Sequence, residues 1–154
     1  MHLGFSFMNT PHDPDPRDLA RALEERGFES LWTGEHSHIP VSRKMLYPAG
    51  DELPEAYKLM GDPYITLMAA ASVTSTLKLG TGIALLMERE LFSQAKTIAS
   101  LDRLSGGRLM IGTGVGWNEE EFTNCTRQPW GKRYGVMRET VMATRALWRD
   151  EEPE

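Results

Sequence analysis

The chain carries two short apolar runs rich in glycine, LGTGI at residues 79–83 and IGTGVGW at residues 111–117. Glycine at the end of a strand leaves the backbone open, so a flat or phosphorylated ligand can approach the main chain closely. The two runs lie about 30 residues apart, and a helix-like stretch precedes each of them. This spacing indicates a repeated strand–helix unit with a binding site at one rim of a sheet.

Length and composition are those of one globular domain over residues 1–154, with 40% hydrophobic and 25% charged residues. The net charge is −5 and there is no basic stripe, which disfavours nucleic acid as a partner. No apolar run reaches the roughly 18 residues of a membrane span, and no secretory signal is visible. We therefore expect a cytoplasmic protein without membrane contact. Cys125 is the single cysteine, and no cysteine–histidine spacing suggests a metal site.

Apolar periodicity and turn signals predict four strands, at residues 2–8, 28–33, 77–86 and 108–114. Two Asp-Pro pairs predict helix starts at Pro16 and Pro63, because aspartate caps a helix and proline fits its first turn. Spacing and composition predict three further helices, at 90–104, from Asn118 onward and at 132–148. Residues 37–61 are expected to form a long ordered loop, and the charged tail at 149–154 is expected to fray.

Helical spacing also predicts which side chains face the core. In the helix that begins at Pro63, the expected inward residues are Ile65, Met68, Ala69, Ser72 and Val73. In the helix at 90–104, they are Phe92, Ala95, Ile98 and Ala99. The resulting order of strands and helices predicts a parallel sheet with right-handed helical crossovers. An open four-stranded sheet and half of an eight-stranded barrel both satisfy this order.

Three segments carry a family pattern in order: GFESLW with EH at residues 27–32 and 35–36, LKLGTGI at 77–83, and SLDRLSGGR at 100–108, which continues to GTGVGWNEEEF at 112–122. Together they resemble the luciferase-like monooxygenase family, in particular its deazaflavin-dependent oxidoreductase branch, over nearly the whole chain. The resemblance implies an α/β fold of TIM-barrel-like (β/α) units. A full barrel takes about 250 residues, so four of its eight units make the N-terminal half of a barrel.

The resemblance also implies a cofactor site at the carboxyl-terminal rim. Glu35 and His36 are the candidate catalytic residues, since a carboxylate can accept hydrogen bonds from a cofactor ring and an imidazole can transfer a proton. The Gly82–Ile83 bond falls where the family has a non-proline cis peptide beneath the ring. The candidate cofactor-binding residues are Asn9, Gly82, Ile83, Gly114, Val115, Gly116 and Trp117.

Other polar residues near this rim receive simpler interpretations. The run Glu119–Glu121 is interpreted as charges at a helix start, with Asn118 and Glu121 resembling a capping box. Glu88 and Arg89 follow the third strand and either bind a polar cofactor tail or are solvated. The long loop at 37–61 is a candidate lid or substrate wall, or a charged surface loop.

Three functions remain open. The first is an oxidoreductase that transfers a hydride between coenzyme F-420, a deazaflavin, and a small-molecule substrate. The second is an FMN-dependent monooxygenase. The third is a half-barrel without catalysis that acts as an assembly partner or an inactive remnant. A dinucleotide-binding module is disfavoured, because the glycines at 112, 114 and 116 lack the G-x-G-x-x-G spacing.

A half-barrel leaves its first and fourth strands as unpaired edges and its inner face uncovered. The sequence therefore leads us to expect a homo-oligomer, in which two copies close on each other, or a second half-barrel chain that supplies the missing strands.

Overall fold

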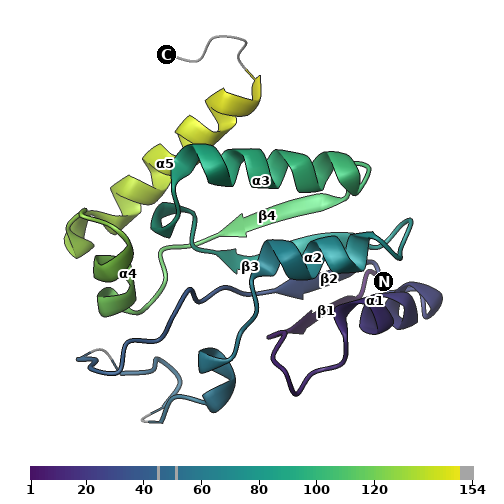
Figure 1. The fold of residues 1–154 in the computed structure, drawn as a ribbon, viewed down its shortest axis with the longest axis horizontal. Coiled ribbons are helices and arrows are strands. Elements are labelled where there is room, and N and C mark those ends of the chain that lie inside the picture. The colour runs from purple at the N-terminus through teal and green to yellow at the C-terminus, as the bar shows by residue number, and fades with distance from the viewer. Residues whose placement is uncertain (45, 51, 150–154) are drawn as a thin grey trace.

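The computed structural model describes residues 1–44, 46–50 and 52–149. At its centre lies one sheet of four parallel strands in the order β1-β2-β3-β4 (Figure 1). The strands are β1 Gly4–Phe7, β2 Ser30–Thr33, β3 Lys78–Ala84 and β4 Leu109–Thr113. All four predicted strands are present, and each is shorter than its predicted range. The tail at 150–154, part of the segment expected to fray, lies outside the described residues.

Helices connect the strands and form a single layer on the sheet (Figure 1). The longer ones are α1 Pro16–Glu25, α2 Pro63–Ala71, α3 Leu91–Leu104 and α5 Arg133–Arg149. The shorter ones are α4 Glu119–Cys125 and the 3-10 helices η1 Glu55–Lys58, η2 Leu86–Glu88 and η3 Trp130–Lys132. Helix α1 packs on α2, α2 on α3 and α3 on α5. A doubly wound sheet has helices on both faces, so this single layer is that of a barrel segment.

The predicted helix starts are confirmed. The Asp15 carboxylate accepts from the amide of Arg17 at 2.9 Å, with Pro16 as the first residue of α1. The Asp62 carboxylate accepts from the amides of Tyr64 and Ile65 at 2.8 and 3.0 Å in the same way. These caps satisfy backbone donors that have no partner inside the helix. Because they act within a few residues, sequence alone predicts them well.

The hydrophobic core lies between the sheet and the helix layer, where Leu31, Leu67 and Leu79 are completely buried. The predicted inward face of α2 is partly wrong, because Ile65 is 72% exposed while Tyr64 and Leu67 are buried. Helix α2 reads PYITLMAAA and is apolar on nearly all sides, so residue spacing does not select a face.

The prediction for α3 is also partly wrong. Ala95 and Ile98 are buried as expected, but Phe92 is 67% exposed and Ala99 is exposed. The buried stripe of α3 instead includes Leu101, and Phe92 and Ala99 border a hollow beside Trp148 of α5. The helix is thus rotated away from the orientation that its apolar residues suggest.

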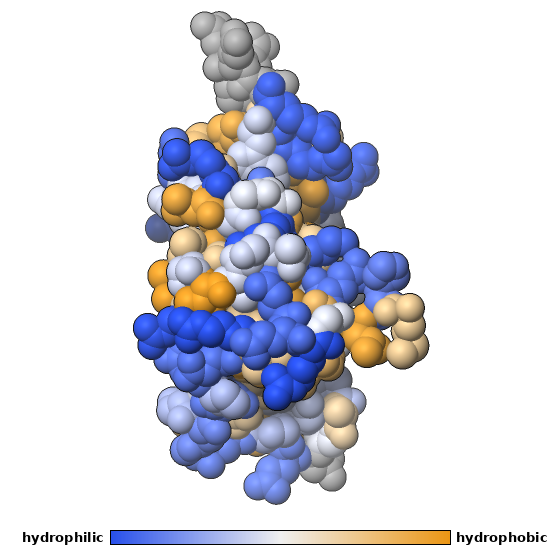
Figure 2. Space-filling model, turned by 90° about the vertical axis from the view of Figure 1, so that its right-hand side faces the viewer, coloured by the Kyte–Doolittle hydropathy of each residue, from blue (hydrophilic) through white to orange (hydrophobic). Residues whose placement is uncertain are grey.

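Strands β1 and β4 each have a strand neighbour on one side only within the described part of the chain (Figure 1). On the sheet face away from the helices, the Trp32 ring lies over Gly80, and its indole nitrogen donates to Ser30 Oγ at 2.8 Å. The end of the molecule where α1 lies presents mainly hydrophilic residues with smaller apolar patches (Figure 2). The opposite end, toward which the strands run, holds the candidate site.

Candidate functional site

The carboxyl ends of β1, β2 and β3 and the loop after β4 enclose a hollow of about 440 Å³. Small-molecule sites in proteins have volumes of about 300–1,000 Å³. Five of the predicted site residues line the hollow: Glu35, His36, Gly82, Ile83 and Trp117. The long loop contributes Tyr57 and Met60, and β1 contributes Ser6, Phe7 and Met8. The glycine-ended strands therefore meet at one rim, as parallel strands with helical crossovers require.

The Gly82–Ile83 peptide bond is cis, as the family resemblance implies. The pairing of β3 with β4 shifts register between Thr81 and Ala84, on either side of this bond. A Cβ at Gly112, within β4, would overlap the backbone oxygen of Thr81 on β3, so this position requires glycine for the two strands to come this close.

His36 is held from both sides of its ring. Its Nδ1 lies 2.6 Å from Oε2 of Glu121, and its Nε2 lies 3.3 Å from the indole nitrogen of Trp117. The side chains of His36 and Glu121 are only 7% and 1% exposed. The other carboxylate oxygen of Glu121 accepts from the amide of Ser37 at 2.9 Å. Helix α4 thus supplies a buried carboxylate to the loop that follows β2.

This arrangement corrects the interpretation of Glu119–Glu121 as simple helix-start charges. Asn118 does cap α4, since its side chain accepts from the amides of Glu120 and Glu121. The Glu121 carboxylate completes no capping box but binds His36, which is 85 residues away in sequence. The local sequence does not identify His36 as the partner of Glu121.

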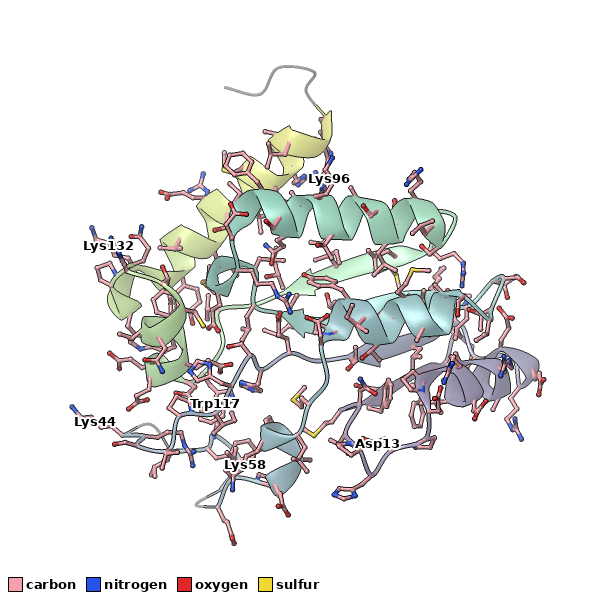
Figure 3. The ribbon with its side chains drawn as sticks, viewed as in Figure 1. Asp13, Lys44, Lys58, Lys96, Trp117 and Lys132 are labelled. Carbon is pink, nitrogen blue, oxygen red and sulfur yellow. The ribbon has the colours of Figure 1, made fainter. Side chains whose placement is uncertain are left out.

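Four aromatic rings form a closed set over the hollow. The ring centroids of His36 and Tyr57, Tyr57 and Tyr47, Tyr47 and Trp117, and Trp117 and His36 lie 5.2–5.8 Å apart, all edge to face. Figure 3 shows Trp117 close to the segment of the long loop that carries Lys58. Burial, together with the hydrogen bond between the Tyr57 and Tyr47 hydroxyls, raises the pKa of Tyr57 to about 12. The long loop is therefore a wall of the hollow.

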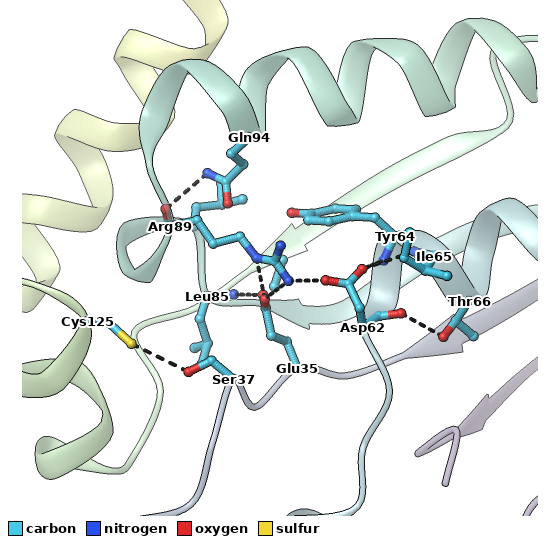
Figure 4. A network of polar contacts seen from close by, with 12 residues as sticks. Glu35, Ser37, Asp62, Tyr64, Ile65, Thr66, Leu85, Arg89, Gln94 and Cys125 are labelled. Atoms are coloured by element: carbon cyan, nitrogen blue, oxygen red, sulfur yellow. Dashed lines mark hydrogen bonds and ion pairs between the residues drawn. The ribbon is translucent and has the colours of Figure 1, made fainter. Parts of the chain in front are cut away.

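Glu35 borders the hollow, but its carboxylate binds protein groups. One oxygen accepts from the amide of Leu85 at 2.7 Å, and the other pairs with Arg89 at 2.5 Å (Figure 4). Arg89 also pairs with Asp62 at 2.7 Å and lies 4.9 Å from the ring centre of Tyr64. Arg89 is therefore held by two carboxylates, although its side chain remains 31% exposed.

Glu88 is a carboxylic acid near the hollow whose pKa is shifted far from its ordinary value. Burial, with the nearby negative charges of Glu121 and Glu35, raises its pKa to about 8. One of its oxygens is buried without a hydrogen-bond partner in the described structure. Burial also raises the pKa of the neighbouring Cys125 thiol, whose Sγ lies 3.5 Å from Ser37 Oγ (Figure 4). The raised pKa favours the protonated form of Glu88 near neutral pH, which its sequence context did not indicate.

The remaining predicted residues lie beside the hollow and not in its lining as described. The Asn9 side-chain amide donates to Thr66 Oγ1, and the backbone carbonyl of Asn9 accepts from the backbone amide of Gly61 at 2.9 Å. Gly114, Val115 and Gly116 form the segment from β4 to Trp117. A Cβ on Gly116, which has a φ of 67°, would contact Leu85. These residues lie next to the lining residues of the hollow and support the backbone of the rim.

A larger hollow of about 580 Å³ lies between α3, β4 and α5, away from the strand ends. Its walls are mainly apolar, with Asp102 and Arg103 at its border. Among the described residues, no group of three or more histidine, cysteine, aspartate or glutamate side chains could hold a metal ion. No helix in the described ranges combines the length and the apolar character required to cross a bilayer.

Comparison with known proteins identifies the family to which the chain is similar. The model of the luciferase-like monooxygenase family matches residues 9–154. An uncharacterized protein of Mycobacterium tuberculosis is 41% identical over 155 residues, covering 99% of this chain and 55% of that protein. This chain thus spans about half the length of that relative.

Two solved structures share the fold. One is the oxygenating constituent of 3,6-diketocamphane monooxygenase from Pseudomonas putida in complex with FMN, with a TM-score of 0.76, 19% identity, and coverage of 98% of this chain and 40% of that one. The other is a secondary alcohol dehydrogenase dependent on coenzyme F-420, with a TM-score of 0.72, 22% identity, and coverage of 99% and 43%. With its family match and its parallel strands in one helix layer, the chain belongs to the luciferase-like monooxygenase family.

Proposed function

We propose that this chain provides the ring-binding part of an oxidoreductase site for coenzyme F-420, a deazaflavin, with a small neutral organic molecule as the hydride donor or acceptor. The observation that carries the proposal is the hollow at the strand ends, where His36 lies beside the Gly82–Ile83 backbone. When bound, the coenzyme would supply the hydride chemistry. Family membership and the F-420-dependent dehydrogenase among the similar folds support this choice.

The residues of the hollow fit a flat, uncharged ring system. Phe7, Met8, Met60 and Ile83 provide apolar contact, and the Gly34 and Gly82 backbones leave room for close approach. No lysine or arginine is part of the described lining. Arg89, the nearest candidate, is neutralised by Glu35 and Asp62. The described lining thus offers a flat ring apolar contact and close approach to the backbone.

The protein's own contribution to the reaction is binding, orientation and proton transfer. His36 is the histidine of the described lining, and an imidazole can exchange a proton with a substrate oxygen as a hydride moves. The Tyr47–Tyr57 pair and Trp117 limit the access of water from the loop side. Glu35, a candidate catalytic residue, contributes through Arg89 in this arrangement, because both of its oxygens are engaged.

The second candidate is an FMN-dependent monooxygenase, favoured by the similar fold that contains FMN. The same hollow would hold its ring. A third is an assembly unit without catalysis, favoured because β1 and β4 each have a strand neighbour on one side only in the described structure. Titration calorimetry with coenzyme F-420, FMN and NAD separates these functions. We expect micromolar binding of coenzyme F-420 and weaker binding of FMN. Tighter binding of FMN would select the monooxygenase, and binding of neither would overturn both redox functions.

A matched pair of variants locates the bound ligand. Met60→Trp fills part of the hollow from the loop, and Met142→Trp places the same side chain on α5, where Met142 is 59% exposed. We expect the first variant to weaken coenzyme binding by about tenfold or more, equivalent to about 1.4 kcal/mol, and the second to leave it unchanged. Equal affinities in the two variants would place the ligand elsewhere.

A further inference from the structure

We propose that Glu121 is a positioning residue that fixes the proton of neutral His36 on Nδ1, so that Nε2 is the nitrogen that exchanges a proton in the hollow. The inference concerns a residue to which the sequence assigned only a helix-start role. Its mechanistic meaning rests on the proposed function, but the proton position itself does not.

Two neighbours on opposite sides of the ring demand the same tautomer. A carboxylate only accepts hydrogen bonds, so Oε2 of Glu121, 2.6 Å away, requires a hydrogen on Nδ1. An indole nitrogen only donates, so Trp117 requires a lone pair on Nε2. Glu121 lies on α4 and Trp117 just before it, yet they contact opposite nitrogens of the ring. Together they leave one arrangement of the neutral ring in which both contacts are hydrogen bonds.

Glu121 is held rigidly enough to impose this choice. Its second oxygen, Oε1, accepts from the Ser37 amide at 2.9 Å and from the Ser37 hydroxyl at 3.4 Å. Its own backbone amide is bound by the Asn118 side chain at 3.2 Å. With the carboxylate 1% exposed, water does not compete for either oxygen. A buried, charge-assisted hydrogen bond of this kind is stronger than one between neutral groups.

The contact on the other side of the ring is weaker and therefore exchangeable. The Trp117 indole nitrogen lies 3.3 Å from Nε2, at the long end for a hydrogen bond, and both residues line the hollow. A substrate hydroxyl in the hollow could take the place of the indole. Once Nε2 gains a proton it can no longer accept, so His36 protonation must release the Trp117 contact. Glu121 would then stabilise the cation through Nδ1.

The test is nitrogen NMR of the imidazoles in the full chain, labelled at histidine and without any cofactor, with the His36 signals assigned by their loss in His36→Asn. We expect the wild-type spectrum of the neutral ring to show the Nδ1–H tautomer. In Glu121→Gln, the population ratio of Nδ1–H to Nε2–H should fall by about tenfold or more, because a charge-assisted bond is lost. Glu119→Gln removes an exposed charge from the same turn of α4 and should leave the ratio unchanged.

A wild-type His36 with its proton on Nε2 would overturn the inference, and this measurement needs no variant to fold. An unchanged ratio in a folded Glu121→Gln protein would also overturn it. Glu121→Asp, which keeps the charge on a shorter stem, should restore part of the Nδ1–H population. If the tautomer is as expected but coenzyme F-420 and FMN do not bind, the positioning role stands and the proposed function fails.

Discussion

At the scale of single residues, Glu88 is the group whose ionisation is most clearly coupled to folding. Burial and the nearby carboxylates of Glu121 and Glu35 raise its pKa from 4.5 to about 8, while the hydrogen bond with Cys125 acts in the opposite direction. An unfolded glutamate loses its proton near pH 4.5, so between pH 4.5 and about 8 the folded state binds more protons than the unfolded state. In that window, the contribution of Glu88 to the free energy of unfolding therefore falls as pH rises.

Glu88→Gln removes this titration while keeping a polar side chain of similar size. We expect the free energy of unfolding of the variant, relative to wild type, to increase between pH 4.5 and 8 and to level off above that range. The expected total is about 1–3 kcal/mol, less than the full shift implies, because solvent screens a half-buried group. Urea denaturation at several pH values measures it. Glu25→Gln, at an exposed site on α1, is the control, and a parallel pH dependence for both variants would refute the prediction.

Glu35, His36, Gly82 and Trp117 lie at or near the ends of predicted strands. The sequence therefore placed them at the rim, because the carboxyl ends of parallel strands meet at one end of the sheet. It could not identify Glu121 as the partner of His36 or Arg89 as the partner of Glu35. Those contacts join segments 85 and 54 residues apart, and a local charge pattern looks the same whether the charge is solvated or buried.

At the scale of elements, Arg108 links two connections between helix and strand. Its guanidinium donates to the carbonyls of Ser105, Leu77, Thr74 and Ala71 at 2.6–3.1 Å, and to the Thr74 hydroxyl at 2.9 Å. The carbonyls of Ala71 and Thr74 lie at the carboxyl end of α2, where unpaired acceptors favour a cation. One side chain thus joins the end of α2, the start of β3 and the turn before β4.

Arg108→Lys keeps the charge but loses the planar fork that reaches all these carbonyls. We expect a loss of about 1–3 kcal/mol in the free energy of unfolding, because buried acceptors remain without a donor. Chemical denaturation measures the loss. Arg103→Lys, at an exposed position near the end of α3, should change stability by less than about 0.5 kcal/mol. Equal stability of the two variants would show that the fork contributes nothing.

The existence and order of the helices and strands were predictable from the sequence, but which face of each helix is buried was not. Caps such as Asp62 act within one turn, so they are readable from sequence. The buried face of a helix depends on its neighbours. Ile65 and Phe92 are exposed because α2 and α3 pack against adjacent helices as well as the sheet, and several apolar sides compete for burial.

At the scale of the whole molecule, β1 and β4 each have a strand neighbour on one side only within the part of the chain that the structure describes. On the β1 side, Leu3 and Phe5 are 44% and 38% exposed, and the β4 side borders the hollow of about 580 Å³. Exposed apolar groups beside an unpaired strand favour association. A second copy related by a twofold axis could place its β1 beside β4, and the reverse, with all strands parallel. We propose this pairing as the arrangement that closes the barrel.

The prediction is that the 154-residue chain is a dimer at micromolar concentration in sedimentation velocity experiments. Leu3→Lys places a charge beside the edge of β1 and should weaken the dimer by about tenfold or more, since a buried unpaired charge opposes association. Ile65→Lys makes the same change at a 72% exposed position on α2, away from both edges, and should leave the dimer intact. A wild-type chain that sediments as a monomer would refute closure by a second copy. Equal dimer affinity in both variants would refute the β1 edge as its interface.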